Sequence, residues 1–354
     1  MSPDRRCGTK SRISRRVASF ATAVVPASLA VGAFAFSLYK RDLAAAKARI
    51  SSGSKLLNTP AGLMEYADVG IGMPVLVIHG AGGGFDQGLE LARPLITSGF
   101  RVIAPSRFGY LRTPLPEDAS PMAQADAYAF LLDTLQLEEV AVVAVSAGGP
   151  SAMQLCIRHP DRSVAMVLIV PLAYSETQAG APKETSSALR AFLMNAFLSS
   201  DFIFWIMSKL ARKKMFSTIL GTPPADVEKA GAEEYAQLTE FLAHIEPISR
   251  RKKGLQNEEA VAQSLTRYEL EQITAPTLIV GIENCLYNTF PGARYTAQHI
   301  PGARFVTYPT GGHMAVGHQT EAWSEVKEFV TQHRVVVNGD SVKTGAPASR
   351  RELR

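Results

Sequence analysis

From residue 59 onward, short apolar runs alternate with longer stretches in which apolar residues have a helical spacing. Such alternation is typical of a parallel sheet covered by helices. The expected strands are Leu63–Ala67, Val75–His79, Arg101–Ala104, Val140–Val145, Val164–Val170, Thr277–Val280 and Arg304–Tyr308. The expected helices are Gln87–Ser98, Met122–Leu135, Ala147–His159 and Thr320–His333. The pattern predicts an α/β fold, a mostly parallel sheet with helices on both faces.

One interval interrupts this alternation. Between residues 173 and 271 only helical stretches occur, among them Ser187–Leu210 and Ala225–Ile245. About a hundred residues are too many for a loop, so we expect a helical cap over 173–271 and a core formed by 59–172 and 272–334. A group of large apolar side chains in the cap either lines a pocket or packs the cap onto the core: Phe192, Phe197, Phe202, Phe204, Trp205, Ile206 and Met207.

The N-terminal region contains a long run without charges. Residues 1–16 are basic, 17–39 are 23 residues without a charge, and 40–58 read as a linker. As a helix the run would reach about 35 Å, enough to cross a bilayer. The basic residues before it place the body on the non-cytoplasmic side. We therefore expect a single-pass transmembrane anchor over 17–39, with a membrane as partner. The alternative is export after cleavage of a signal peptide at Ala33-Phe34-Ala35.

The net charge of +5 is unevenly distributed. The first fifty residues hold ten basic and two acidic side chains, so the rest of the chain is acidic overall. Because the basic residues gather at the ends of the chain, a nucleic-acid partner is excluded. Three cysteines are too few for a disulfide framework or a zinc cluster. The tail over 335–354 is polar and basic and is expected to be flexible.

The first chemical candidate follows the expected strand Val140–Val145. Ser146 stands between this strand and a helix, with Ala144 and Gly148 two residues to either side. A nucleophile on a sharp strand-to-helix turn needs small residues at those places. The turn would also aim the Ala147 N–H at a developing oxyanion. Taken alone, the pattern is equally compatible with an ordinary strand-to-helix turn.

Two glycine-rich loops support the chemical interpretation. Gly80-Ala81-Gly82-Gly83-Gly84 follows Val75–His79, and its N–H groups could point at a ligand, with Ala81 as the second oxyanion donor. This loop lacks the ending of a phosphate-binding loop and the spacing of a dinucleotide fingerprint. The strand Arg304–Tyr308 runs into Gly311-Gly312-His313, where His313 could act as general base.

Together these features resemble the α/β-hydrolase superfamily, over nearly all of residues 59–333. The sequence is most similar to its capped branch of serine esterases and C–C-bond hydrolases, in which the cap lies between strands six and seven. The shared motifs are the His79-Gly80 loop, the elbow at Ser146, Pro301-Gly-Ala-Arg-Phe305 and Gly311-Gly312-His313.

The resemblance assigns roles to several residues. Ser146 is the expected nucleophile and His313 the base, and the amides of Ala81 and Ala147 form the oxyanion hole. No metal and no organic cofactor are expected. A serine at the elbow excludes the members of the fold that attack through a carboxylate.

The triad acid departs from the family pattern. The resemblance places it about three residues beyond Gly281, and that position holds Asn284. An amide can orient His313 but cannot stabilise its positive charge, and the loss can reach ~10⁴ in rate. Glu283 is the expected acid; Glu176, or no acid at all, are the alternatives.

We therefore expect a serine hydrolase that cleaves a carboxylic ester, thioester or amide of an apolar small molecule through an acyl-serine. One alternative is a catalytically silent ligand-binding protein of the same fold, which the missing aspartate motivates. The other is a hydrolase of C–C bonds in products of aromatic ring cleavage.

Overall fold

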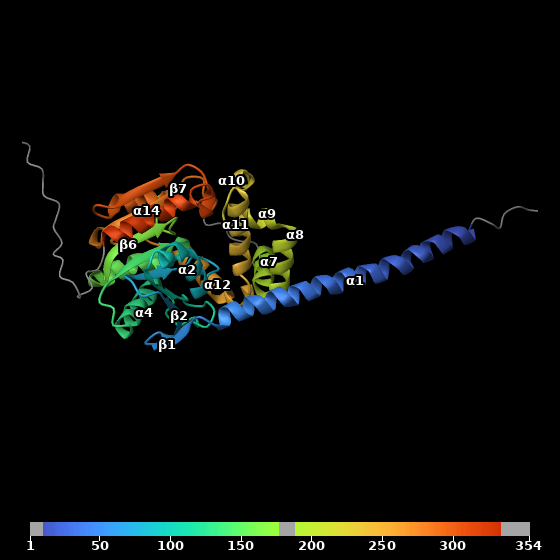
Figure 1. The fold of residues 1–354 in the computed structure, drawn as a ribbon, viewed down its shortest axis with the longest axis horizontal. Helices are drawn as coiled ribbons and strands as arrows, with labels where there is room; N and C mark the ends of the chain where they lie inside the picture. The colour runs from blue at the N-terminus through green and yellow to red at the C-terminus, as the bar shows by residue number, and fades with distance from the viewer. Residues whose placement is uncertain (1–9, 177–187, 334–354) are drawn as a thin grey trace, which may run out of the picture. The chain divides into compact units, whose positions relative to one another are not determined.

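The computed structural model describes residues 10–176 and 188–333. The chain divides into two compact units, Met1–Ala48 and Arg49–Arg354. The first unit consists of most of helix α1 (Lys10–Ser51), which is drawn in blue in Figure 1. Part of the basic segment over 1–16 and the whole tail over 335–354 lie outside the described residues.

The expected transmembrane anchor falls inside α1. Within residues 10–176 and 188–333, we find no helix with the length and apolar character needed to cross a membrane. The predictions of an anchor over 17–39, of a membrane partner and of a membrane localisation are therefore wrong. The physical reason lies in the composition of the run: 13 of its 23 residues are Ala, Ser, Thr, Gly or Pro, whose transfer into lipid gains far less than that of Leu or Phe.

The second unit contains an eight-stranded sheet in the order β1-β2-β4-β3-β5-β6-β7-β8. β1 and β2 pair antiparallel, as do β2 and β4, and every other neighbouring pair is parallel. The strands are β1 (Lys55–Thr59), β2 (Gly62–Val69), β3 (Pro74–Ile78), β4 (Arg101–Pro105), β5 (Val140–Val145), β6 (Ser163–Ile169), β7 (Thr277–Ile282) and β8 (Arg304–Tyr308). The predicted α/β fold is confirmed. Residues 40–58, expected as a linker, instead hold the end of α1 and most of β1.

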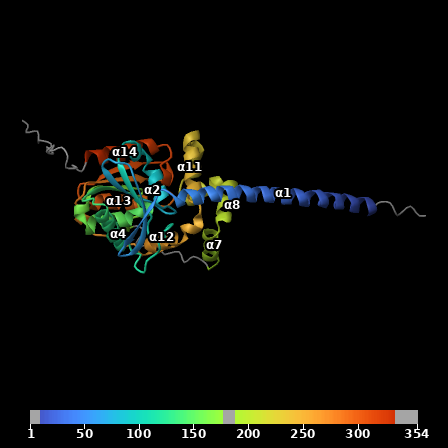
Figure 2. The same ribbon diagram turned by 60° about the horizontal axis from the view of Figure 1, so that its bottom comes forward.

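Helices cover both faces of the sheet (Figures 1 and 2). One face packs against α4 (Pro121–Thr134), α5 (Gly149–Arg158) and α13 (Phe290–His299). The other packs against α2 (Phe85–Leu91), α3 (Arg93–Thr97) and α14 (Gln319–Gln332). The expected single helix over 87–98 is thus two helices, which separate at Ala92, just before a proline in the first turn of α3.

The central strand β5 shows why an uninterrupted apolar run was needed. Successive side chains of a strand point to opposite faces. Val142 and Ala144 belong to the apolar cluster on one face, and Ala141 and Val143 to the cluster on the other. All four are fully buried. With no face open to water, β5 carries no polar position until it reaches its carboxyl end, where chemistry becomes possible.

Between β6 and β7 the chain forms only helices among its described residues. These are α7 (Ala188–Ser199), α8 (Asp201–Leu210), α9 (Arg212–Ile219), α10 (Pro224–Lys229), α11 (Ala232–His244) and α12 (Lys252–Ser264). We call them the inserted helices; α7, α8 and α11 lie together in both views (Figures 1 and 2). They share an apolar cluster that includes Phe204, Phe216, Leu238 and Leu242. Of the segment predicted as a cap, residues 177–187 lie outside the described residues.

Candidate active site

Ser146 stands at the carboxyl end of β5, where the strand turns into α5. Its φ of +53° is in the left-handed region, which a residue with a side chain adopts only under strain. A Cβ at Gly148 would lie 2.8 Å from the carbonyl oxygen of Ile78 and 2.9 Å from that of His79. Only glycine therefore lets the elbow pack against the end of β3, which is the physical reason for the small residue after Ser146.

The glycine-rich loop after β3 lies against this elbow. A Cβ at Gly80 would be 3.1 Å from the Cβ of Ser146. Ala81 lines the same cavity as Ser146, and Ala147, the residue after Ser146, is buried in the elbow. The structure thus places Ala81 in the cavity of Ser146 and buries Ala147 directly after the serine.

His79 fixes the start of this loop. Its buried ring donates from Nδ1 to the carbonyl oxygen of Gly80 at 2.7 Å, and its Nε2 accepts the backbone N–H of Arg107 at 3.0 Å. Burial, together with the positive charge of Arg107, lowers the pKa of His79 well below its usual value. A neutral imidazole with one donor and one acceptor satisfies both contacts, so His79 acts as a brace of the loop.

Arg251 ties the inserted helices to the same loop. Its guanidinium is fully buried and donates to the carbonyl oxygens of Gly83 and Ile245 and to the carboxylate of Asp86. Burial alone would raise the pKa of Asp86, but the charges and hydrogen bonds of Arg251 and Arg49 outweigh it and lower the pKa to about 2. Asp86 is therefore ionised at neutral pH. Its ion pair with Arg251, which also contacts Gly83, holds the glycine-rich loop in place.

His313 follows β8 on a turn that requires glycines. Gly312 has a φ of +61°, and a Cβ there would lie 2.7 Å from the Cα of Thr222. The backbone N–H of His313 donates to Gly221 at 3.1 Å. The ring of Tyr287 meets the imidazole edge-on, with 4.9 Å between the ring centres. Burial lowers the pKa of His313 to about 4, so the imidazole is neutral at physiological pH and able to accept a proton.

Ser146, His313 and Ala81 line one cavity of about 120 Å³. Its remaining walls are largely apolar and come from both the core and the inserted helices, with Leu91, Ile169, Leu220, Phe241, Ile245 and Trp323 among them. The apolar residues that the sequence suggested for a pocket do not form these walls. Phe204 and Trp205 of α8 are buried instead, and the side chain of Phe192 lies outside the described residues.

The neighbours of His313 differ from those expected. The Sγ of Cys285 lies 3.2 Å from its Nδ1. Glu283 is exposed on the turn after β7, and Glu176 is exposed as well; the structure brings neither carboxylate to the ring. Asn284 donates to Asp226 and accepts the backbone N–H of Gly312 at 2.9 Å, so it braces the loop.

Sequence reasoning therefore missed Cys285 and Asp226. The signal for Cys285 was a cysteine one position beyond the place expected for the acid. Asp226 lies far from that place in sequence, on α10, and no motif marks it.

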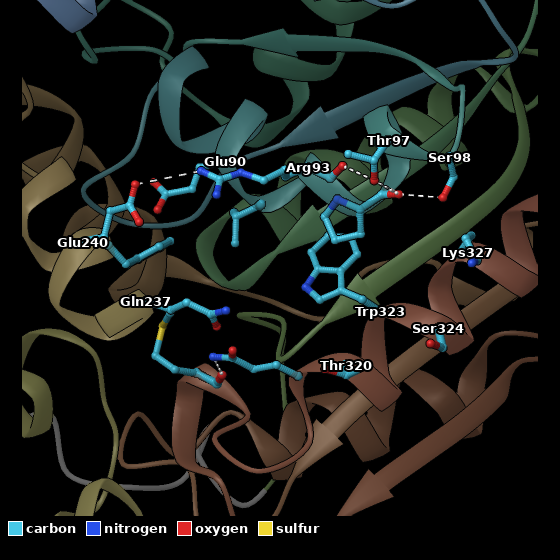
Figure 3. A pocket seen from close by; sticks show the side chains of 15 residues that line it. Glu90, Arg93, Thr97, Ser98, Gln237, Glu240, Thr320, Trp323, Ser324 and Lys327 are labelled. Carbon is cyan, nitrogen blue, oxygen red and sulfur yellow. Dashed lines mark hydrogen bonds and ion pairs between the residues drawn. The ribbon is translucent and has the colours of Figure 1, made fainter. Parts of the chain in front are cut away.

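A larger cavity of about 530 Å³, drawn in Figure 3, adjoins the first. The two share the lining residues Leu91, Phe241, Met314, Gln319 and Trp323. The larger one adds charged groups, of which Arg93 and Glu240 lie 3.9 Å apart. Among the described residues, Glu90, Glu240 and His244 have ligand atoms close enough to hold a metal ion, but Nδ1 of His244 already contacts Glu90 at 2.6 Å.

Comparisons with known proteins bear on the fold and the class of protein. The family model for the alpha/beta hydrolase fold matches residues 73–317. The uncharacterized hydrolase YcgS of Bacillus subtilis is 26% identical over 266 residues, 72% of this chain and 89% of that protein. The 2-hydroxymuconate semialdehyde hydrolase of Pseudomonas sp. (strain CF600) is 36% identical over 106 residues, 29% of this chain and 38% of that protein. The structure of an alpha/beta hydrolase fold protein from Nakamurella multipartita is 28% identical, with a TM-score of 0.62, and the match covers 78% of this chain and 98% of that one.

Proposed function

The chain belongs to the alpha/beta hydrolase fold family, and from that premise we propose that it is a serine hydrolase that cleaves a carboxylic ester, thioester or amide. The observation that carries the proposal is the strained turn at Ser146, with a φ of +53°, in a cavity shared with His313 and Ala81. Strain at one non-glycine residue persists only where the surrounding structure enforces it, and it is typical of nucleophile turns.

The proposed reaction proceeds in two halves. The Oγ of Ser146 attacks the carbonyl carbon while Nε2 of His313 takes its proton. The N–H groups of Ala81 and Ala147 donate to the oxyanion of the tetrahedral intermediate. The leaving group departs with the proton from His313, which leaves an acyl-serine. Water then gives a proton to His313 and attacks the acyl carbon; as the bond between the acyl carbon and Oγ breaks, His313 returns that proton to Ser146 and the carboxylic acid is released.

The two cavities suggest where the two parts of a substrate bind. The smaller cavity is narrow and mostly apolar, so we assign it to a short apolar group next to the scissile carbonyl. The larger cavity combines Trp323 with the charged side chains of Arg93, Glu240 and Lys327. We assign it to a bulkier, more polar part of the substrate. The residues that line both cavities mark the place where the substrate would pass from one to the other.

A second candidate function is hydrolysis of a C–C bond beside a carbonyl. It is favoured by the identity of 36% over 106 residues with a 2-hydroxymuconate semialdehyde hydrolase, although that match spans only 38% of the relative. The same serine, base and oxyanion donors would serve this reaction. The difference lies in the leaving group, a carbanion that must be protonated.

Labelling with a fluorophosphonate tests the nucleophile without knowledge of the substrate. The reagent needs an activated serine and an oxyanion hole. We expect intact mass to show one adduct on the wild-type chain and none on Ser146→Ala. The matched control is Ser151→Ala, because Ser151 is also buried near the elbow but lies outside the reaction cavity; it should label like the wild type.

Two results would contradict the proposal. Labelling that survives in Ser146→Ala would place the reactive serine elsewhere, and an unlabelled wild type would favour the ligand-binding alternative. Once labelling is established, nitrophenyl esters of increasing acyl length are compared with a vinylogous 1,5-diketone. Turnover of the diketone alone would select the second candidate function.

A further inference from the structure

A sulfur atom faces the ring nitrogen that a triad acid would contact. Cys285 lies in the turn between β7 and α13 and is 6% exposed. Its Sγ is 3.2 Å from Nδ1 of His313. The hydroxyl of Thr289 donates to the same sulfur at 3.3 Å. Cys285 thus has two polar neighbours, and one of them is the proposed base.

The turn around Cys285 explains why this residue and not a carboxylate reaches the base. The backbone N–H of Glu283 donates to Tyr308 at 2.9 Å, which continues the pairing of β7 with β8 and leaves the Glu283 side chain exposed. The Asn284 side chain is held by Asp226 and by the backbone of Gly312. Cys285 is the next residue, and it is buried beneath the imidazole.

The imidazole is also fixed from its other sides. The backbone N–H of His313 donates to Gly221, and the imidazole and the Tyr287 ring meet nearly at a right angle. The hydroxyl of Tyr287 donates to the carbonyl oxygen of Ile219 at 2.7 Å, so Tyr287 is itself anchored to the inserted helices. A ring held in this way has one remaining freedom that matters for catalysis, namely which nitrogen carries the proton.

We propose that Cys285 takes the place of the triad acid and is the positioning residue for His313. Its sulfur accepts a hydrogen bond from the Nδ1–H of His313, so that Nε2 has no proton and can take one from Ser146. The proposal rests on the proposed function, because Cys285 positions His313 for the serine hydrolase reaction. The thiol exchanges no proton or electron; every proton that moves in the reaction passes through Nε2 of His313.

A thiol at this position does only half of what a carboxylate does. Sulfur is a weak acceptor without charge, so it selects the tautomer but does little to stabilise the imidazolium. A carboxylate would add an opposite charge, which raises the pKa of a histidine by about 1–3 units. Replacement by Asp should therefore improve the base, an outcome that a purely structural cysteine would not produce.

The test uses four cysteine variants of the full chain, together with Ser146→Ala, and two measurements. Cys285 is changed to Ala, Ser and Asp, and Cys156→Ala serves as the matched control, since Cys156 is equally buried but contacts Ser163 and Met166 in the core. The first measurement is the rate of fluorophosphonate labelling as a function of pH. The second is the tautomer of His313, read from the ¹⁵N shifts of its two ring nitrogens.

We expect Cys285→Ala to label about 10-fold more slowly, since one hydrogen bond to the ring is lost. Cys285→Ser, which keeps an acceptor, should stay within about 3-fold of the wild type. Cys285→Asp should label about 10-fold faster, with its acid limb displaced to higher pH by about 1–3 units. Cys156→Ala should match the wild type.

The proposal is overturned if the wild-type ring carries its proton on Nε2, or if Cys285→Ala and Cys285→Asp both label with the wild-type rate and pH profile. The tautomer of His313 is also measured in Ser146→Ala, because this readout does not depend on a reactive serine. If the wild-type chain does not label but its ring carries the proton on Nδ1, the role of the sulfur is supported and the serine hydrolase is contradicted. Labelling of the wild type together with a proton on Nε2 would support the serine hydrolase and contradict the role of the sulfur.

Discussion

Replacement of His313 by Gln measures what burial of the imidazole costs the folded chain. Burial lowers the pKa of His313 to about 4, from 6.5 for the ordinary side chain. The unfolded chain therefore binds this proton more tightly than the folded one. The contribution of neutral His313 to stability is complete above pH 6.5 and is lost as the pH falls from 6.5 toward 4.

The magnitude follows from the two pKa values. The difference in proton binding amounts to about 2 kcal/mol at pH 5 and to about 0.2 kcal/mol at pH 7. The wild type should therefore lose about 2 kcal/mol more than His313→Gln between pH 7 and pH 5. This is an upper bound, because the ring lines a cavity that water can enter. Burial also keeps His79 neutral, but His79 is present in both proteins and cancels in the comparison.

The assay is urea unfolding of both full chains at pH 7, 6 and 5, with the free energy taken from the midpoint and slope of each curve. Labelling of the wild type offers a second readout. If the pKa of His313 is about 4, the labelling rate should not change between pH 7 and about pH 5. Equal losses of stability in the two proteins, or an acid limb in labelling near pH 6.5, would refute the reasoning.

Two further predictions concern positions around the site. Gly221 has a φ of +56°, and a Cβ there would lie 2.7 Å from the Tyr287 ring and 3.0 Å from the Cβ of His313. Gly221→Ala should slow labelling about 100-fold by displacing His313, the proposed base, whereas Gly231→Ala, with open space around it, should not. Glu258 of α12 forms a buried ion pair with Arg107. Glu258→Ala should lower the free energy of unfolding by about 3–5 kcal/mol, and the exposed neighbour Glu259→Ala by less than about 0.5 kcal/mol, both measured by urea unfolding; equal effects of the two changes would contradict the role of the pair.

The fold was predictable because its signals are local and repeated. The apolar run of β5 and the small residues around Ser146 are both dictated by close packing, and close packing leaves its mark on the sequence. The antiparallel strand β1 was missed because Lys55–Thr59 is largely exposed and so lacks an apolar pattern.

The surroundings of His313 were harder to predict for a different reason. Counting from Gly281 assumes that the chain turns at a fixed residue after β7. In this chain the backbone of Glu283 still pairs with Tyr308 of β8, the turn comes after it, and Cys285 is the residue that faces the ring. No periodicity reports where the turn comes, because this depends on the partner strand. The prediction of a transmembrane anchor was wrong for a different reason. A segment without charges, such as 17–39, is not necessarily strongly apolar.

The contact of Arg251 with the loop behind the serine has a consequence for engineering. Arg251 precedes α12, yet its guanidinium satisfies the carboxylate of Asp86 and the carbonyl oxygen of Gly83. A chimera that replaced the inserted helices with those of another hydrolase would leave the buried Asp86 with Arg49 but without Arg251, and would remove the donor that now reaches the carbonyl oxygen of Gly83. The helices are therefore not an exchangeable module. Any graft must carry an arginine at this position or change Asp86 with it, whereas single replacements at Leu220 or Phe241 can reshape the cavity and leave that coupling intact.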